Sequence, residues 1–238
     1  MRLEKLDIFR WIAIVLMVIF HLNYSLVHIF DIWFLNFSDT FWFIVWKISV
    51  TLFMFIAGIS FYLAEKKYSS DITKKYLKIS ILLAIFAGII SIVTYYFYNS
   101  LYIRFGILHY FSLSFLLMLF FRKLGYYNAI IWIIIIIYWV YFIPIISNTH
   151  LFFLWFMYPW FKSSDYYPIF PYFWIMLLWY SIWLFLDNIN KLNLLKLKSE
   201  KNIFDKILEY LWKKSFIIYL IHQPIIIWVL YVGVFIFT

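Results

Sequence analysis

Long apolar segments are the feature of this sequence that most restricts its fold. Seven segments are mainly apolar and have about the 17–25 residues that a helix needs to cross roughly 30 Å of hydrocarbon. They are residues 8–30, 41–64, 77–98, 106–121, 129–146, 168–186 and 215–237. Backbone groups inside a bilayer find no water, so segments of this length span it as helices. The sequence therefore predicts an all-α, polytopic membrane helix bundle of about seven transmembrane helices.

The composition agrees with a membrane protein. The chain is 67% hydrophobic and 13% charged, whereas a soluble domain is nearer half apolar and a quarter charged. It contains no cysteine, which excludes disulfides and thiol catalysis. The formal net charge of +9 would suggest a nucleic-acid partner in a soluble protein. Here the basic residues fall in short loops between apolar segments, so they report orientation, and no nucleic-acid partner is predicted.

Basic residues predict the orientation of the chain in the membrane. With the N-terminus in the cytoplasm, the segments on that side hold all of the 20 basic residues except Lys47, Arg104 and Lys162. The positive-inside rule therefore predicts a cytoplasmic N-terminus and an outer C-terminus. We expect one membrane domain over residues 1–238, in the plasma membrane of a prokaryote. The spacing of Ile203, Ile207 and Leu211 predicts an amphipathic inner-leaflet helix at about residues 199–214.

Titratable side chains concentrate in the outer half of the predicted bundle. Helical rise places His21 roughly 20 Å from the inner end of its helix, with His28 near the outer surface. The other members of this group are Lys47, Arg104, His109, His150 and Asp165, with Asn23 and Ser25 nearby. Intramembrane ionisable groups commonly face a cavity or a partner, so a shared wet pocket is predicted. The alternatives are structural: a histidine bonded to a neighbouring helix, or Lys47 paired with Asp165 or reaching the interface.

A second polar group is predicted near the cytoplasmic surface. His222 and Gln223 lie about two turns from the inner end of the last helix, and Pro224 interrupts the hydrogen bonding there. Asp7 and Arg10 lie at the inner mouth of the first helix. The alternative interpretation of these two residues is a capped helix start with a positive-inside anchor.

Six stretches resemble one family in the same order along the chain. They are RLEKLDIFRWIAIVLMVIFH, LFMFIAGIS, IISIVTYYF, FGILHYFSLS, DYYPIFPYF and SFIIYLIHQPI. Together they resemble the YeiB/heparan-α-glucosaminide N-acetyltransferase superfamily over almost the whole chain. Trp11 and Trp174 stand where the family pattern has glycine, which suggests altered helix contacts or a narrower pocket.

The resemblance implies a transmembrane acyltransferase. Such an enzyme moves an acetyl or acyl group from cytoplasmic acetyl-CoA to an amine or hydroxyl of an extracytoplasmic sugar or glycolipid. His21 and His109 match the family motifs and His28 is the nearest counterpart of a further histidine, so these three are the candidate catalytic residues. A neutral imidazole can act as general base because its pKa lies near working pH.

The remaining candidate residues are expected to bind either the acyl donor or the acceptor substrate. Cations bind phosphate. The polar group near the cytoplasmic surface and the basic residues of the first cytoplasmic loop are therefore expected to bind acyl-CoA. The expected donor-binding residues are Asp7, Arg10, Lys78, His222 and Gln223. The expected acceptor-binding residues are Asn23, Lys47, Arg104 and Asp165. No metal is expected, and the prediction allows a homodimer.

Two other functions stay open at this stage. A proton-coupled transporter or a lipid-handling protein would use the histidines as a proton relay or as a headgroup site. A non-catalytic membrane scaffold would need none of the five histidines.

Overall fold

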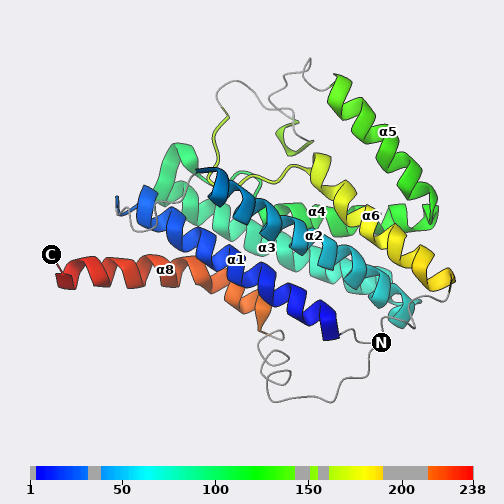
Figure 1. Cartoon of the computed structure of the whole chain (residues 1–238), viewed down its shortest axis with the longest axis horizontal. Coiled ribbons are helices and arrows are strands. Elements are labelled where there is room, and N and C mark those ends of the chain that lie inside the picture. Colours follow the sequence, from blue (N-terminus) through cyan, green and yellow to red (C-terminus); the bar gives the residue numbers. More distant parts are fainter. Residues whose placement is uncertain (1–3, 32–38, 143–150, 155–160, 190–213, 238) are drawn as a thin grey trace. The chain divides into compact units, whose positions relative to one another are not determined.

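The fold is given by a computed structural model, which describes residues 4–31, 39–142, 151–154, 161–189 and 214–237. Seven α-helices lie within these ranges (Figure 1). They are α1 (Glu4–His28), α2 (Asp39–Tyr68), α3 (Ile72–Tyr98), α4 (Ile107–Phe121), α5 (Tyr127–Phe142), α6 (Ile169–Asn188) and α8 (Ser215–Phe237). Three 3₁₀ turns accompany them: η1 (Asn99–Leu101), η2 (Arg122–Leu124) and η4 (Phe152–Leu154). The described residues form no β-strand, so the predicted all-α class is confirmed.

Six of these helices are long and apolar enough to cross a membrane. They are α1, α2, α3, α4, α6 and α8, with α4 reaching the required length when η2 extends it to Leu124. The apolar stretch of α5, Tyr127–Tyr138, is shorter. The predicted polytopic bundle is therefore confirmed, while its orientation stays a prediction. The amphipathic segment 199–214, apart from Lys214, and His150 lie outside the described residues.

The helices form two compact units, divided within α2. The first unit contains α1, α8 and α2 up to Ile56. Its α2 segment is tied to α1 by Ser49, whose hydroxyl donates a 3.0 Å hydrogen bond to the carbonyl of Ala13. Alongside α1 lies α8, which runs in the same direction (Figure 1). Because the chain divides into two compact units, the prediction of one membrane domain over residues 1–238 stays a prediction.

The second unit contains α2 from Ala57 onward and α3 to α6. Its helices α2 and α6 pack backbone against backbone at Gly58. A Cβ at that position would lie 2.2 Å from the carbonyl oxygen of Met176, so a side chain cannot fit. Small residues allow close approach of this kind between membrane helices, where dispersion and weak Cα–H···O contacts hold the pair.

A polar network joins the ends of the second-unit helices. Glu65 of α2 accepts hydrogen bonds from the Arg122 guanidinium at 2.9 Å and from the Tyr180 hydroxyl at 2.7 Å. Nearby, the Tyr62 hydroxyl donates to the Asp187 carboxylate. These bonds tie α2 to η2 and α6 at the end that the charge pattern assigns to the cytoplasm.

Replacing Gly58 with alanine should destabilise the protein, because α2 and α6 would have to move apart. Overpacking of this kind typically costs about 1–3 kcal/mol. Gly88 of α3 is the matched control, since a Cβ at that position would have no neighbouring atom within 4 Å and alanine favours helix. Thermal unfolding of detergent-solubilised protein should show a lower midpoint for Gly58→Ala and an unchanged or higher one for Gly88→Ala. Equal midpoints for the two variants would contradict the close contact.

Candidate functional site

Two polar side chains of α1 and two of α8 meet within the first unit. The imidazole rings of His21 and His222 lie 4.9 Å apart between centres, edge to face at 73°. One turn further along α1, the buried hydroxyl of Ser25 accepts a 3.1 Å hydrogen bond from Nε2 of Gln223. Polar side chains within membrane helices pair in this way because no water is available to them.

Hydrogen bonds to the backbone define which nitrogen carries the proton in each ring. Nδ1 of His21 lies 2.8 Å from the Met17 carbonyl oxygen, and Nδ1 of His222 lies 2.5 Å from that of Tyr219. A carbonyl oxygen only accepts, so each neutral ring carries hydrogen on Nδ1 and a lone pair on Nε2. Nε2 of His222 is buried and has no hydrogen-bond partner among the described residues. Each ring therefore offers a basic nitrogen, as proton transfer requires.

The predicted separation of an inner and an outer polar group is wrong for His222 and Gln223. Both contact α1 at residues assigned to the outer half of the bundle. Counting depth from each helix start assumes that all helices begin in one plane. Gln223 is roughly 12 Å from the start of α8, whereas Ser25 is about 31 Å from the start of α1. Helix α8 therefore begins partway along α1 (Figure 1).

The other predicted residues of the first unit have separate surroundings. His28, at the end of α1, is exposed, and its ring lies 4.6 Å from that of Tyr24. Oδ1 of Asn23 is buried without a hydrogen-bond partner among the described residues. The Lys47 ammonium lies 4.5 Å from the centre of the Trp46 ring, a cation–π distance.

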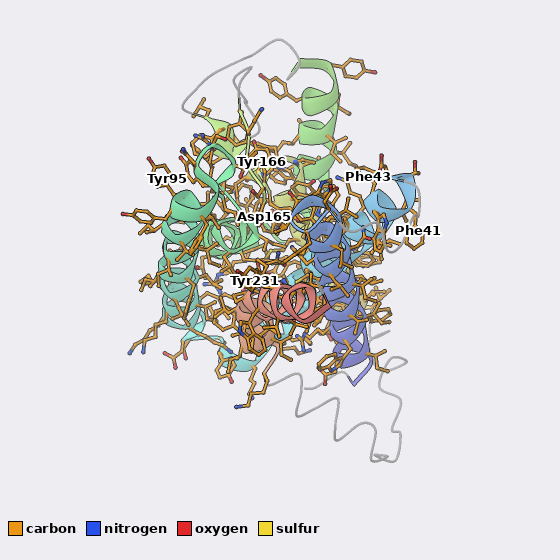
Figure 2. The ribbon with its side chains drawn as sticks, turned by 90° about the vertical axis from the view of Figure 1, so that its left-hand side faces the viewer. Phe41, Phe43, Tyr95, Asp165, Tyr166 and Tyr231 are labelled. Carbon is orange, nitrogen blue, oxygen red and sulfur yellow. The ribbon has the colours of Figure 1, made fainter. Side chains whose placement is uncertain are left out.

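The N-terminus of α4 is capped by a carboxylate from the loop before α6. Oδ2 of Asp165 accepts a 3.0 Å hydrogen bond from the N–H of Ile107. This bond satisfies one of the backbone donors that a helix leaves unpaired at its start. A Cβ on Gly106 would lie 2.4 Å from the same oxygen, so glycine is required there. Figure 2 labels Asp165 and Tyr166 within this second unit, and Tyr95 on the outside of α3.

His109 uses both ring nitrogens to hold the same helix start. Its Nδ1 accepts a 3.2 Å hydrogen bond from the N–H of Gly106. Its Nε2 lies 3.3 Å from Oγ of Ser91, whose own hydrogen is donated to the Ile103 carbonyl at 2.6 Å. The Nε2–H of His109 is therefore the donor to Ser91. In this arrangement the basic lone pair of His109 is engaged by the backbone.

Hydroxyl groups without a predicted role order the segment before α4. Thr94 Oγ1 accepts a 3.0 Å hydrogen bond from the Ile103 N–H. Ser163 Oγ accepts one of 3.2 Å from the Arg104 N–H. Ser91 and Thr94 belong to the stretch IISIVTYYF, so the resemblance of this stretch to the family could have identified them as site residues. Ser163 lies just before DYYPIFPYF and carried no signal of its own.

The Arg104 side chain is held at the surface of the second unit. Its Nε donates a 3.1 Å hydrogen bond to the Lys162 carbonyl. Its guanidinium carbon lies 4.5 Å from the centre of the Tyr102 ring and 5.7 Å from that of Phe161. Stacking on two rings restricts the planar guanidinium, which is the arrangement arginine uses to bind anionic or carbonyl groups.

The predicted donor-binding residues near the chain start and in the first inner loop are partly engaged. Asp7 is buried and forms a 2.9 Å ion pair with Arg10, one turn along α1. Lys74 and Lys78, one turn apart on α3, are exposed. Exposed ammonium groups are available to phosphate, whereas the Arg10 guanidinium already has a carboxylate partner.

The structure assigns the predicted histidines to different units. His21 and His28 belong to the first unit and His109 to the second, so their convergence on one pocket stays a prediction. Among the described residues, no group of three or more His, Asp or Glu side chains could hold a metal ion.

A family model described as the catalytic part of heparan-alpha-glucosaminide N-acetyltransferase matches residues 2–224. The chain belongs to this family. No curated protein and no solved structure matches it. The match confirms the resemblance seen in the motifs, and the family is one of membrane acetyltransferases.

One departure from the family pattern has a visible consequence. Trp174, which the motif resemblance sets at a glycine of the family pattern, is 3% exposed on α6. Its ring stacks on Phe170 at 5.7 Å and meets the edge of Phe121, at the end of α4, at 5.5 Å. In this member of the heparan-α-glucosaminide N-acetyltransferase family, the indole therefore fills space between α4 and α6.

Asp165 should make the stability of the protein depend on pH. Burial raises the pKa of its carboxyl to about 6, and the hydrogen bond from Ile107 offsets part of this rise. Between the ordinary value of 3.8 and about 6, the folded protein binds this proton more tightly than the unfolded chain does. The contribution of Asp165 to stability therefore falls as pH rises through that window.

Asp165→Asn keeps the acceptor oxygen and removes the ionisation, so its unfolding midpoint should vary less between about pH 4 and about pH 7 than that of the wild type. Asp165→Ala leaves the Ile107 N–H unpaired, and it should unfold earlier throughout that range, at a cost of about 0.5–2 kcal/mol. Thermal unfolding in detergent measures both. Parallel pH profiles for wild type and Asp165→Asn would contradict the raised pKa.

Proposed function

We propose that the chain is a membrane acyltransferase with acyl-CoA as donor. It would move an acetyl or other acyl group from the cytoplasmic side to an amine or hydroxyl of an extracytoplasmic sugar or glycolipid, in the plasma membrane of a prokaryote. Family membership over residues 2–224 supports the reaction class. The charge pattern supports the sidedness, because it assigns the Lys-rich loops to the cytoplasm and the C-terminal ends of α1 and α8 to the outer side.

The observation that carries the assignment of the base is the hydrogen bonding of His21 and His109, two of the three candidate histidines. Nδ1 of His21 donates to the Met17 carbonyl, which leaves its Nε2 lone pair for a substrate proton. The His109 lone pair accepts from the Gly106 N–H instead. We therefore assign the general base to His21 and a structural role at the start of α4 to His109.

The reaction follows directly from this assignment. The acceptor nitrogen or oxygen attacks the thioester carbonyl, a new C–N or C–O bond forms, and the C–S bond to CoA breaks. His21 Nε2 takes the proton that the acceptor loses, and the CoA thiolate is finally protonated. General-base assistance of this kind contributes about 10²–10⁴ to the rate. Alignment of thioester and acceptor contributes the larger part.

Residues on the two sides would hold the two substrates. The exposed Lys78, with Lys74 on the same face of α3, would contact the CoA phosphates. The buried Oδ1 of Asn23 would accept a hydrogen bond from the acceptor.

A proton-coupled transporter is the second candidate, because paired histidines within a membrane are also used to relay protons. Its signature would be proton-dependent solute uptake into liposomes without CoA. Acyl-CoA turnover that depends on an added amino sugar would instead support the acyltransferase.

The same substitution at two positions separates the roles of the two histidines. His21→Asn keeps a donor for the Met17 carbonyl but removes Nε2, and we expect acyl transfer to fall by about 10²–10⁴-fold. His109→Asn keeps an acceptor for the Gly106 N–H, and we expect most activity to remain. The assay follows CoA release from acetyl-CoA with glucosamine as acceptor, and unfolding midpoints check that both variants fold. A fully active His21→Asn variant would overturn the assignment.

A further inference from the structure

The His21–His222 pair has a feature that a single general base does not need. Both rings donate Nδ1–H to a carbonyl of their own helix, which fixes both tautomers and both ring orientations. Both therefore keep their lone pair on Nε2, and the rings are in edge contact at 4.9 Å. Nε2 of His222 is buried without a partner among the described residues. An unpaired buried acceptor is unfavourable unless some state of the protein supplies a hydrogen.

A proton on one ring supplies that hydrogen. If His21 takes a proton on Nε2, a small rotation of the rings from their edge-to-face contact would let its new N–H be donated to the lone pair of His222, which has no hydrogen-bond partner in the present arrangement. We propose that His21 and His222 share one proton between α1 and α8, and that His222 is the positioning residue for the base of acyl transfer. This inference rests on the proposed function. It assigns His222 to the outer-half base instead of to acyl-CoA.

The charged groups around the pair offer nothing to balance a second proton. Helix α8 carries no acidic or basic side chain besides His222, and Tyr219 contacts the His222 ring. On α1, the His28 ring lies 4.6 Å from the Tyr24 ring, tilted by 49°, at the exposed end of the helix. A second proton would place two positive charges in contact, with no carboxylate on α8 to balance them.

The charged residues of the first-unit part of α2 are Asp39 and Lys47. Asp39 is exposed in the first turn, and the Lys47 ammonium lies over the Trp46 ring. In the same unit, the Asp7 carboxylate is paired with Arg10, about four turns before His21 on α1. None of these groups is therefore placed to balance two positive charges on the pair, which limits it to one shared proton at most.

The proton path balances over one reaction. The acceptor loses its proton to His21 Nε2 as its bond to the acyl carbon forms. That proton is held between the two Nε2 atoms while the C–S bond breaks, and it then returns to the CoA thiolate directly or through water. The pair starts and ends neutral, and no other reactant is needed.

Nitrogen-15 NMR of histidine-labelled full-length protein in nanodiscs tests the pair without reference to activity. We expect Nδ1-protonated tautomers for both rings at neutral pH. On acidification, a through-hydrogen-bond N–N coupling between the two Nε2 atoms should appear. His222→Asn keeps a donor for the Tyr219 carbonyl but has no Nε2, so this coupling should be lost. Gln223→Met is the matched control, because it removes the Ser25 contact and leaves both rings in place.

Kinetics of the same variants test the positioning role. His222→Asn should lower kcat by up to the factor of about 10²–10⁴ that the base supplies, with an unchanged KM for acetyl-CoA. Because the two rings act together, His21→Asn with His222→Asn should be no slower than His21→Asn alone.

The outcomes separate the two proposals. Independent titration of the rings, with no coupling at any pH, would overturn the shared proton whether or not the protein transfers acyl groups. A coupling that is present while His222→Asn retains full kcat would overturn the positioning role. A coupling in a wild-type protein that turns over no acyl-CoA would keep the pair and overturn the proposed function.

Discussion

The interior of a bilayer contains no water, and this constraint determines the partners of every polar group that the chain carries there. Backbone groups are satisfied within helices, which is why the described chain is helical throughout its apolar segments. Many polar side chains there bond to one another or to a carbonyl, although Asn23 Oδ1 and His222 Nε2 have no hydrogen-bond partner among the described residues. Ser49 bonds to Ala13, and His21 bonds to the carbonyl of Met17. The site is built from these pairings.

The same constraint gives two histidines of one chemical type different properties. His109 lies at the start of α4, where unpaired backbone N–H groups need acceptors, and its lone pair serves one of them. His21 lies well inside α1, where its own helix offers a carbonyl acceptor, and its lone pair stays available. Helix position, more than residue type, thus separates a structural imidazole from one suited to proton transfer.

Much of the fold could be predicted from the sequence, because hydrophobic length and charge are properties of each segment by itself. The apolar segments correspond to helices, and α4 reaches its spanning length through η2. The ends of α2 lie outside the predicted range because the polar Asp39 and the Glu65–Tyr68 turn continue the helix beyond the apolar part. The motif order also indicated the family, which the match over residues 2–224 confirms.

The partners of the site residues depended on tertiary structure. His222 contacts His21 because α8 begins partway along α1. This offset between the two helix starts cannot be predicted from the sequence of either segment alone. Asp165 and Ile107 are distant in sequence, as are Glu65 and Tyr180, so their hydrogen bonds exist only once the loops and helices have packed. The sequence by itself determined a helical membrane protein of an acetyltransferase family and a set of candidate site residues. The packing decided that the His21 and His222 rings meet and that Asp165 caps α4, because such contacts depend on where a partner distant in sequence lies in space.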